Sequence, residues 1–125
     1  MPTTEQVRAA LDAYVKAFST DDRQGWLATF APNARQEDPV GSPVNVGREA
    51  IGAFWDNVRK RAERYEFDVR NQIVCGNEAV LAFTMTAWNG DNGICFDAVD
   101  VITVDDDGLI SSLRAFFDPS QMRPV

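Results

Sequence analysis

The stretch Ile94-Cys95-Phe96-Asp97-Ala98-Val99-Asp100-Val101-Ile102-Thr103-Val104 is rich in apolar residues and typical of a β-strand, in which successive side chains point to opposite faces. Asp100 shares one face with five apolar residues: Ile94, Phe96, Ala98, Ile102 and Val104. Glycine-containing and Asn/Asp-rich turn sequences lie on either side, at residues 89–93 and 105–108, and predict hairpin connections to neighbouring strands. We therefore expect this strand inside an antiparallel sheet.

The neighbouring segments repeat with the same period of two. From Glu66 onward, Phe67, Val69 and Ile73 alternate with polar residues. The next run places Ala79, Leu81, Phe83, Met85 and Ala87 on one face, and the last run does the same for Leu109, Leu113, Ala115 and Phe117. These runs and the Asp100 strand predict a four-strand antiparallel meander.

The first half of the chain has helical spacing instead. Residues 4–20 form an amphipathic pattern, with Thr3 or Thr4 as the N-cap. Asp21 and Asp22 offer N-caps for a second helix that runs through Trp26, Leu27 and Phe30 and ends at Pro32. A short segment from Ala34 to Asp38 then enters a Pro/Gly loop at residues 39–43, and a third helix follows Gly47, with apolar positions from Ile51 to Ala62.

Helices followed by a meander predict one α+β domain over residues 1–125, in which a curved sheet closes over the three helices. Such a sheet leaves an apolar cavity between its concave face and the helices, and we expect a small-molecule site there.

Composition narrows the classes of partner. Nineteen acidic residues against twelve basic ones give a net charge of −7, which disfavours nucleic acid and anionic membranes. No apolar run approaches the roughly 20 residues of a membrane helix, and the N-terminus lacks a signal-peptide pattern. We therefore expect a cytoplasmic protein without a membrane partner.

The chain contains no histidine, which removes the commonest general base and the commonest zinc ligand. Cys75 and Cys95 both fall in apolar strand-like segments, as buried reduced thiols usually do. Any proton transfer must therefore be carried out by carboxylates or tyrosine.

Three polar side chains fall on surfaces that the patterns assign to the interior: Tyr14, Asp38 and Asp100. An unpaired carboxylate on an interior face loses its hydration, and the least costly response is to stay protonated with a raised pKa. A neutral carboxylic acid can donate a hydrogen bond. Asp100, together with Tyr14 and Asp38, therefore indicates a site that stabilises a developing oxyanion.

Structural roles remain open for the same three residues. Asp100 also fits the solvent-facing end of its strand or an ion pair with an arginine such as Arg114. Tyr14 also fits the core, with its hydroxyl on water or a carbonyl, and Asp38 also fits a turn before proline. Seven aromatic residues are first of all core candidates and by hypothesis the walls of the cavity: Phe30, Phe54, Trp55, Phe83, Trp88, Phe116 and Phe117.

The string Glu37-Asp38-Pro39-Val40-Gly41-Ser42-Pro43, followed by Gly47-Arg48-Glu49-Ala50-Ile51 and Phe54, resembles the signature of the bacterial ketosteroid isomerases. The resemblance extends over nearly the whole chain and includes Tyr14 in the first helix and Asp100 in the penultimate strand. It implies the cone-shaped α+β fold shared with nuclear transport factor and the polyketide cyclases, with a curved, mixed or antiparallel sheet and usually a homodimer.

The resemblance also implies roles for individual residues. Asp38 would be the general base, and Tyr14 and protonated Asp100 would donate to the oxyanion of a dienolate during Δ5-to-Δ4 isomerisation of a 3-oxo steroid. Phe117 would pack on the steroid, and no metal or organic cofactor would be required. Phe30 and Trp55 stand where some relatives carry tyrosines that support the helix-one tyrosine. The alternatives are a polyketide cyclase-like enzyme and a non-catalytic steroid or lipid carrier of the same fold.

Overall fold

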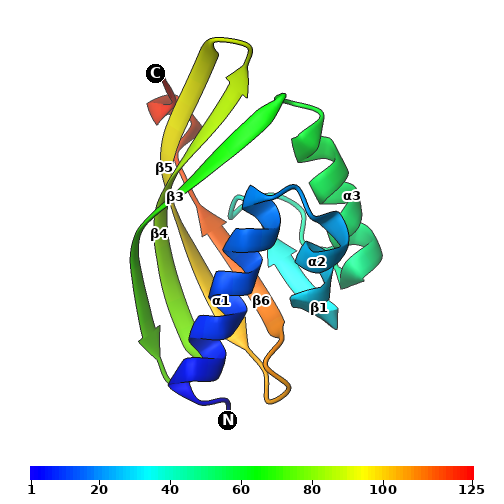
Figure 1. Ribbon diagram of the computed structural model, residues 1–125. Coiled ribbons are helices and arrows are strands. Elements are labelled where there is room, and N and C mark those ends of the chain that lie inside the picture. The colour runs from blue at the N-terminus through cyan, green and yellow to red at the C-terminus, as the bar shows by residue number, and fades with distance from the viewer.

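Three helices lie on one side of a curved sheet in the computed structural model, which describes residues 1–125 (Figure 1). The helices are α1 (Thr4–Ser19), α2 (Arg23–Ala28) and α3 (Gly47–Arg59). The main strands are β1 (Phe30–Glu37), β3 (Arg64–Cys75), β4 (Glu78–Asn89), β5 (Asn92–Val104) and β6 (Ile110–Phe116). Two short strands, β2 (Asn45–Val46) and β7 (Arg123–Pro124), and a 3₁₀ turn (Pro119–Gln121) complete the chain. The expected α+β class is confirmed.

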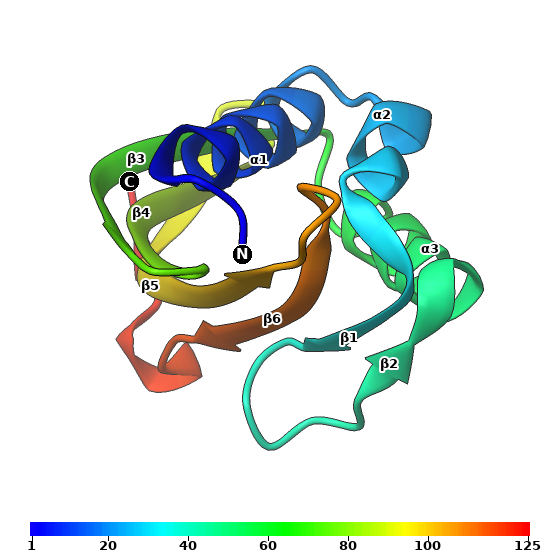
Figure 2. The same cartoon turned by 90° about the horizontal axis from the view of Figure 1, so that it is seen from below.

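The sheet has the order β2-β1-β6-β5-β4-β3, and β7 pairs with β5. All pairs are antiparallel except β1 with β6, which are parallel, so the sheet is mixed. Figure 2 shows the sheet curving around the helices. The register places Asp100 of β5 between Leu81 of β4 and Ala115 of β6. The predicted meander is therefore correct, and Asp100 lies on an interior strand.

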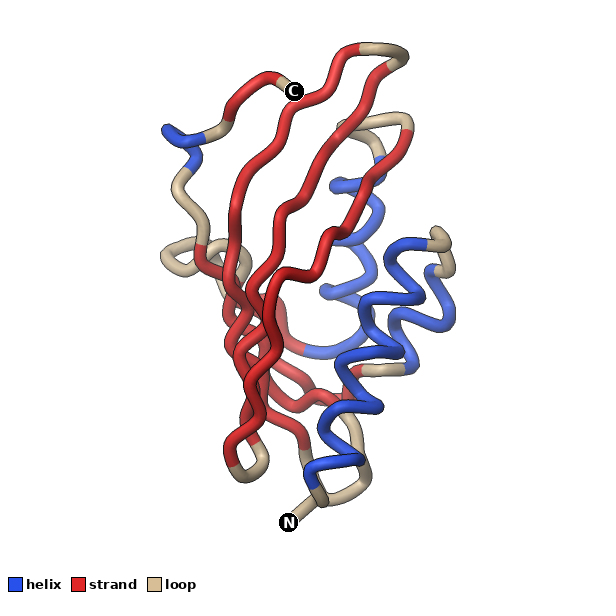
Figure 3. Tube along the Cα trace, turned by 60° about the vertical axis from the view of Figure 1, so that its left-hand side comes forward, coloured by secondary structure: helices blue, strands red, loops and turns tan.

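The helices all cover the concave face (Figure 3). A capping box between Thr3 and Gln6 starts α1, which satisfies backbone N–H groups that have no partner within the helix. Its buried residues face β3 and β4. At the start of α3, the guanidinium of Arg48 donates two hydrogen bonds to the carbonyl oxygen of Phe30, which ties this helix to β1. None of the helices is long and apolar enough to cross a membrane.

The predicted end of the second helix is wrong. The helix stops at Ala28, and Phe30 and Pro32 belong to β1. Phe30 is fully buried and pairs with Ile110 of β6, so tertiary packing overrides the helical spacing. The ladder is irregular between Phe30 and Arg35, which accommodates an exposed proline that has no N–H to donate. The third helix also ends earlier than expected, at Arg59.

A bulge changes the facing of β3. Val69 pairs with Phe83 and Asn71 pairs with Ala82, so Arg70 is an extra residue in the strand. Beyond it the alternation reverses, and Ile73 is 56% exposed where the sequence pattern placed it with the buried face. The cysteine prediction is wrong for Cys75, which is exposed, whereas Cys95 is buried; both are free.

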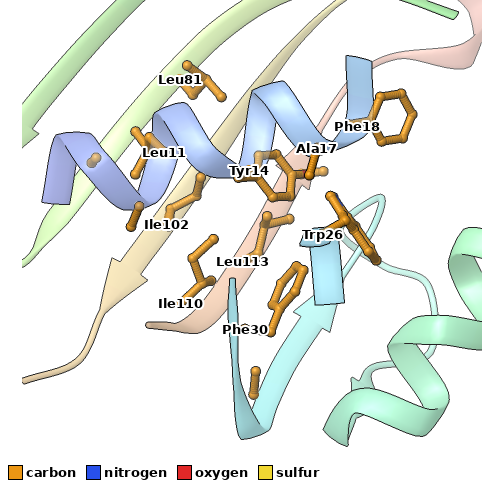
Figure 4. Close-up of a cluster of buried hydrophobic side chains, with 14 of the residues drawn as sticks. Leu11, Tyr14, Ala17, Phe18, Trp26, Phe30, Leu81, Ile102, Ile110 and Leu113 are labelled. Atoms are coloured by element: carbon orange, nitrogen blue, oxygen red, sulfur yellow. The ribbon is translucent and has the colours of Figure 1, made fainter. Parts of the chain in front are cut away.

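The core lies between α1, α2 and the concave face of the sheet (Figure 4). The largest fully buried side chains come from the three helices and from the sheet: Leu11, Trp26, Ile51, Phe30, Leu81, Ile102, Ile110 and Leu113. At the end of the sheet near the β4–β5 turn, this packing gives way to a cavity.

Candidate active site

A cavity of about 350 Å³ lies between the concave face of the sheet and the helices. Every second residue of β5 from Asn92 to Asp100 lines it, which is the inward face predicted from the alternation. Sixteen of its twenty-two lining residues are hydrophobic. Tyr14, Asp38 and Asp100 all line the same cavity, so the structure brings the three predicted polar residues together.

Asp100 is 2% exposed, and its Oδ2 is buried without any hydrogen-bond partner. Burial raises the pKa of this carboxyl well above its usual range, and the charge of Asp38 raises it further, while contact with Tyr14 acts in the opposite direction. Arg114 is not its partner, because the Arg114 Nε donates to Glu37 at 3.2 Å. Arg114 is also the register partner of Val101, not of Asp100. Burial therefore favours the neutral form of Asp100, a residue of the cavity lining whose Oδ2 has no partner within the protein.

Tyr14 projects from α1 and is 5% exposed. Its ring packs edge-on against Phe30 and Phe67, at centroid distances of 6.0 and 6.2 Å. Burial raises the pKa of the phenol well above 10, and Asp100 and Asp38 add to this, so the hydroxyl keeps its proton. Asp100 and Trp26 are polar side chains near enough to the phenol to act on its pKa, Asp100 raising it and Trp26 lowering it. Tyr14 is thus a second neutral donor beside Asp100.

Asp38 directly follows β1 and is half-buried. Burial raises the pKa of its carboxyl to about 6, although the side chain remains partly accessible, because apolar groups surround it while the cavity leaves one side open. Two positions earlier, the fully buried Gln36 accepts a hydrogen bond from the side chain of Asn45 at 3.0 Å, which holds this end of β1. At neutral pH Asp38 is the ionised carboxylate of the site.

The difference between the two carboxyls follows from their surroundings. Asp38 ionises first because it is the less enclosed of the two, and its negative charge then opposes ionisation of Asp100. Asp100 stays neutral and exerts no charge on Asp38 in return. One cavity therefore contains a proton acceptor and two proton-bearing donors, which is the arrangement needed to remove a proton next to a carbonyl and stabilise the resulting enolate.

A family model for the SnoaL-like domain matches residues 11–113. The chain belongs to the SnoaL-like domain family. It is also 34% identical over 117 residues, or 94% of each chain, to a protein of Nocardioides simplex named steroid Delta-isomerase. The resemblance to the ketosteroid isomerases is confirmed by this similarity.

Solved structures show the same fold for this SnoaL-like domain. The Δ5-3-ketosteroid isomerase of a Mycobacterium species superposes with a TM-score of 0.83 at 23% identity, covering 96% of this chain and 98% of that one. The epoxide hydrolase/cyclase-like enzyme SalBIII, described in pyran ring formation of salinomycin, gives a TM-score of 0.87 at 24% identity over 98% of both chains. At these identities the likeness establishes the cone-shaped fold.

Only part of the predicted aromatic set lines the cavity of this SnoaL-like domain. Phe54, Phe83 and Phe117 do. Phe30 and Trp55 instead pack in the core against Trp26, each at a centroid distance of 4.9 Å. Trp88 and Phe116 are also absent from the cavity lining: the Trp88 indole donates to Glu66 at 2.9 Å, and Phe116 is 41% exposed. The prediction that these four residues line the cavity is therefore wrong, because aromatic character does not distinguish a core residue from a cavity residue.

Sequence reasoning missed other parts of the lining. Trp26 and Phe18 come from the helices, and Tyr65, Met85 and Phe96 come from inward-facing positions of β3, β4 and β5. The period of two already marked Met85 and Phe96 as inward-facing. One end of the cavity is polar and is formed by Arg61, Asn89 and Asn92. This end is far from Asp100, because the eight residue steps from Asn92 to Asp100 span about 26 Å along an extended strand. The SnoaL-like domain contains no group of three His, Cys, Asp or Glu side chains suited to a metal ion.

Proposed function

We propose that the protein is a steroid Δ-isomerase that converts 3-oxo-Δ5-steroids into 3-oxo-Δ4-steroids. The observation that carries the proposal is the buried carboxyl of Asp100, whose Oδ2 has no partner in an apolar cavity that also contains Asp38 and Tyr14. An isolated buried acid is costly unless a ligand uses it. A steroid ketone oxygen, which becomes an oxyanion during the reaction, is the partner that we propose.

Asp38 is the general base of the proposed mechanism. Its carboxylate removes a proton from C4, which gives a dienolate, and the same carboxyl then delivers the proton to C6. A pKa of about 6 leaves it mostly ionised at neutral pH yet basic enough to hold the proton briefly. Such general base catalysis contributes about 10²- to 10⁴-fold to the rate.

Tyr14 and Asp100 donate hydrogen bonds to the dienolate oxygen. Both are buried and both keep their protons, so they can donate to an oxyanion that water does not reach. A donor of this kind contributes about 2.7 to 4 kcal/mol to stabilising the transition state when it is already in place before the reaction.

The apolar walls bind the steroid rings and keep Asp100 neutral at the same time. Phe54, Phe83 and Phe117 supply aromatic surface to a cavity whose volume falls in the range of small-molecule sites. The reaction moves one proton within the substrate, so we propose that it needs no metal or organic cofactor. That the protein acts in the cytoplasm also remains a prediction.

The test is a spectroscopic assay with 5-androstene-3,17-dione, in which the conjugated enone product absorbs where the substrate does not. We expect turnover by the wild-type protein and loss of most turnover in Asp38→Asn. A wild-type rate equal to that of buffer contradicts the proposal.

A second candidate is a polyketide cyclase-like reaction, in which Asp38 again acts as the base. The polar end of the cavity, formed by Arg61, Asn89 and Asn92, favours it because these groups suit an oxygen-rich substrate. The third possibility is a carrier without catalysis. Equilenin, a phenol that mimics the enolate, distinguishes carriage from catalysis: an isomerase binds it much more tightly than a saturated steroid, and a carrier binds both equally.

We also infer a homodimer from the outer face of the sheet. Two cross-strand rows of apolar residues lie there, on the face opposite the helices: Ile73, Val80 and Val101, and next to them Ala82, Val99 and Phe116. Ile73, Val80 and Phe116 are 37–56% exposed. A contiguous apolar surface on a sheet of this size is typical of an interface. The proposed partner is a second copy of this chain, paired face to face.

A further inference from the structure

Trp26 is a polar group of the cavity to which the mechanism above gives no role. It follows the first turn of α2 and is 1% exposed, and it is one of the residues that line the cavity. Its Nε1 is buried and has no hydrogen-bond partner. A buried N–H group without a partner is costly, so an acceptor near it needs to be identified.

The phenol of Tyr14 is the neighbouring acceptor. The two rings lie next to each other, with centroids 5.9 Å apart and planes inclined by 35° (Figure 4). The indole cannot turn away, because Phe30 and Trp55 pack against it at 4.9 Å each. Its helix is held as well, since Asp22 caps α2 and Arg23 forms a salt bridge with Asp56 at 2.9 Å.

We propose that Trp26 is a positioning residue whose indole N–H donates to the phenolic oxygen of Tyr14 and thereby turns the hydroxyl proton of Tyr14 toward the ligand. The consequence for catalysis rests on the proposed isomerase function. The hydrogen bond between Trp26 and Tyr14 is proposed independently of that function.

The chemistry of indole makes the direction of this hydrogen bond fixed. Indole Nε1–H is a donor only, whereas a phenol both donates and accepts. When Trp26 occupies one lone pair of the phenolic oxygen, the hydroxyl proton must point elsewhere, and Asp100 and the cavity occupy the other side. A tyrosine in the place of Trp26 could either donate to Tyr14 or accept from it, so it would not fix the direction of the hydrogen bond. Phe30 and Trp55 make no polar contact with Tyr14, so Trp26 alone fills this role.

The Trp26 N–H also affects the pKa of Tyr14, in the direction that favours hydrogen-bond donation by the phenol. Burial, Asp100 and Asp38 all raise the pKa of Tyr14, and the Trp26 N–H is the group that lowers it. A donor that stabilises the phenolate makes the neutral phenol a stronger hydrogen-bond donor. Trp26 therefore both orients and strengthens the Tyr14 donor.

The first experiment needs no activity. The three tryptophans give three indole N–H signals in a ¹H–¹⁵N spectrum of the labelled protein, assigned with single Trp→Phe variants. Tyr14→Phe removes the acceptor, and we expect the Trp26 indole proton to move upfield by more than those of Trp55 and Trp88. A Trp26 signal that stays in place overturns the proposal, whether or not the protein is an isomerase.

The second experiment measures how the rate depends on the pair. Trp26→Phe keeps the ring and deletes the N–H, and we expect kcat to fall about 2- to 10-fold with KM unchanged, as for one hydrogen bond. In a Tyr14→Phe background the same change should have no further effect on kcat. Trp88→Phe, which removes an indole outside the cavity whose N–H donates to Glu66, is the matched control and should leave kcat unchanged.

The outcomes separate the two proposals. Additive losses in the double variant, or an equal loss in Trp88→Phe, contradict a role for Trp26 through Tyr14. Absence of turnover in the wild-type protein contradicts the isomerase function and leaves the spectroscopic test of the Trp26 contact in force.

Discussion

The backbone amide of Val40 donates a 2.8 Å hydrogen bond to the carbonyl oxygen of Ala115, and Ala115 is the register partner of Asp100. The loop that follows Asp38 is therefore fixed to the strand next to the one that carries Asp100. Two segments far apart in the sequence thus hold the two carboxyls at one cavity. Because the attachment uses backbone atoms, side-chain changes at either acid should leave the geometry intact, which makes substitution experiments interpretable.

Asp38→Asn should lose at least 10²-fold in kcat, because the amide cannot accept the C4 proton. Affinity for a steroid or for equilenin should stay the same or increase, since the change removes a charge from an apolar site. Steady-state kinetics and equilibrium titration with equilenin measure the two quantities. Full activity in this variant would show that another group is the base.

The pH dependence of kcat/KM should report Asp38 in the free protein. The base must be ionised, and its pKa is raised to about 6, so kcat/KM should be constant above neutrality and fall tenfold per pH unit below pH 6. Initial rates between pH 4.5 and 8 at low substrate concentration provide the measurement. A profile that stays flat down to pH 5 is incompatible with this assignment.

Changes at Asp100 should affect rate more than stability. Asp100→Leu removes the donor and should cost about 10²- to 10³-fold in kcat, while Asp100→Asn keeps an N–H donor and should cost less. Neither should unfold the protein, because the buried Oδ2 makes no hydrogen bond that the fold requires. Urea unfolding and kcat are measured on the same samples. A large loss of stability with unchanged kcat would assign Asp100 a structural role.

The inward direction of Asp100 was predictable from the sequence because β5 pairs with β4 without interruption from Asn92 to Thr103. An unbroken ladder preserves the period of two, so the face of each residue follows from counting. The same counting failed on β3, where the extra residue Arg70 reverses the alternation and exposes Ile73. No local signal in the sequence marks this bulge, which bends the strand and increases its twist.

The role of Asp38 as a base was inferred only through the resemblance, because one aspartate before a proline is equally typical of a turn. Trp26 was not predicted as a site residue at all. Its helical spacing marks it as buried, but the free Nε1 beside Tyr14 depends on the crossing of α1 and α2, which is a tertiary property. Burial patterns identify which residues are inside the protein, and they do not distinguish the core from the cavity.

The outer face of the sheet should hold two copies together. Val80→Glu places a charge at the centre of the apolar rows, where burial against a second copy is unfavourable. We expect the wild-type protein to sediment as a dimer and the variant as a folded monomer in analytical ultracentrifugation. Asp91→Glu, on the exposed β4–β5 turn, is the control that should remain dimeric. A wild-type monomer at all concentrations would contradict the inferred interface.

Asp38 should make the wild-type protein less stable as the pH rises. Its carboxyl has a usual pKa of 3.8 and a pKa of about 6 in the folded state, so the folded state holds this proton more tightly than the unfolded state. The resulting stabilisation is complete below pH 3.8 and is lost as the pH rises through 6. Asp38→Asn has no such proton to lose.

The difference in unfolding free energy between Asp38→Asn and the wild type should therefore increase from pH 4 to pH 8. The increase should be at most about 3 kcal/mol, since each pKa unit corresponds to about 1.4 kcal/mol. Urea unfolding at pH 4, 6 and 8 measures it, with Asp91→Asn on the exposed β4–β5 turn as the matched loss of a carboxylate. Stability curves that run parallel for Asp38→Asn and the wild type would mean that Asp38 is well hydrated. The carboxylate would then lack the raised basicity that the proposed proton transfer from C4 to C6 requires.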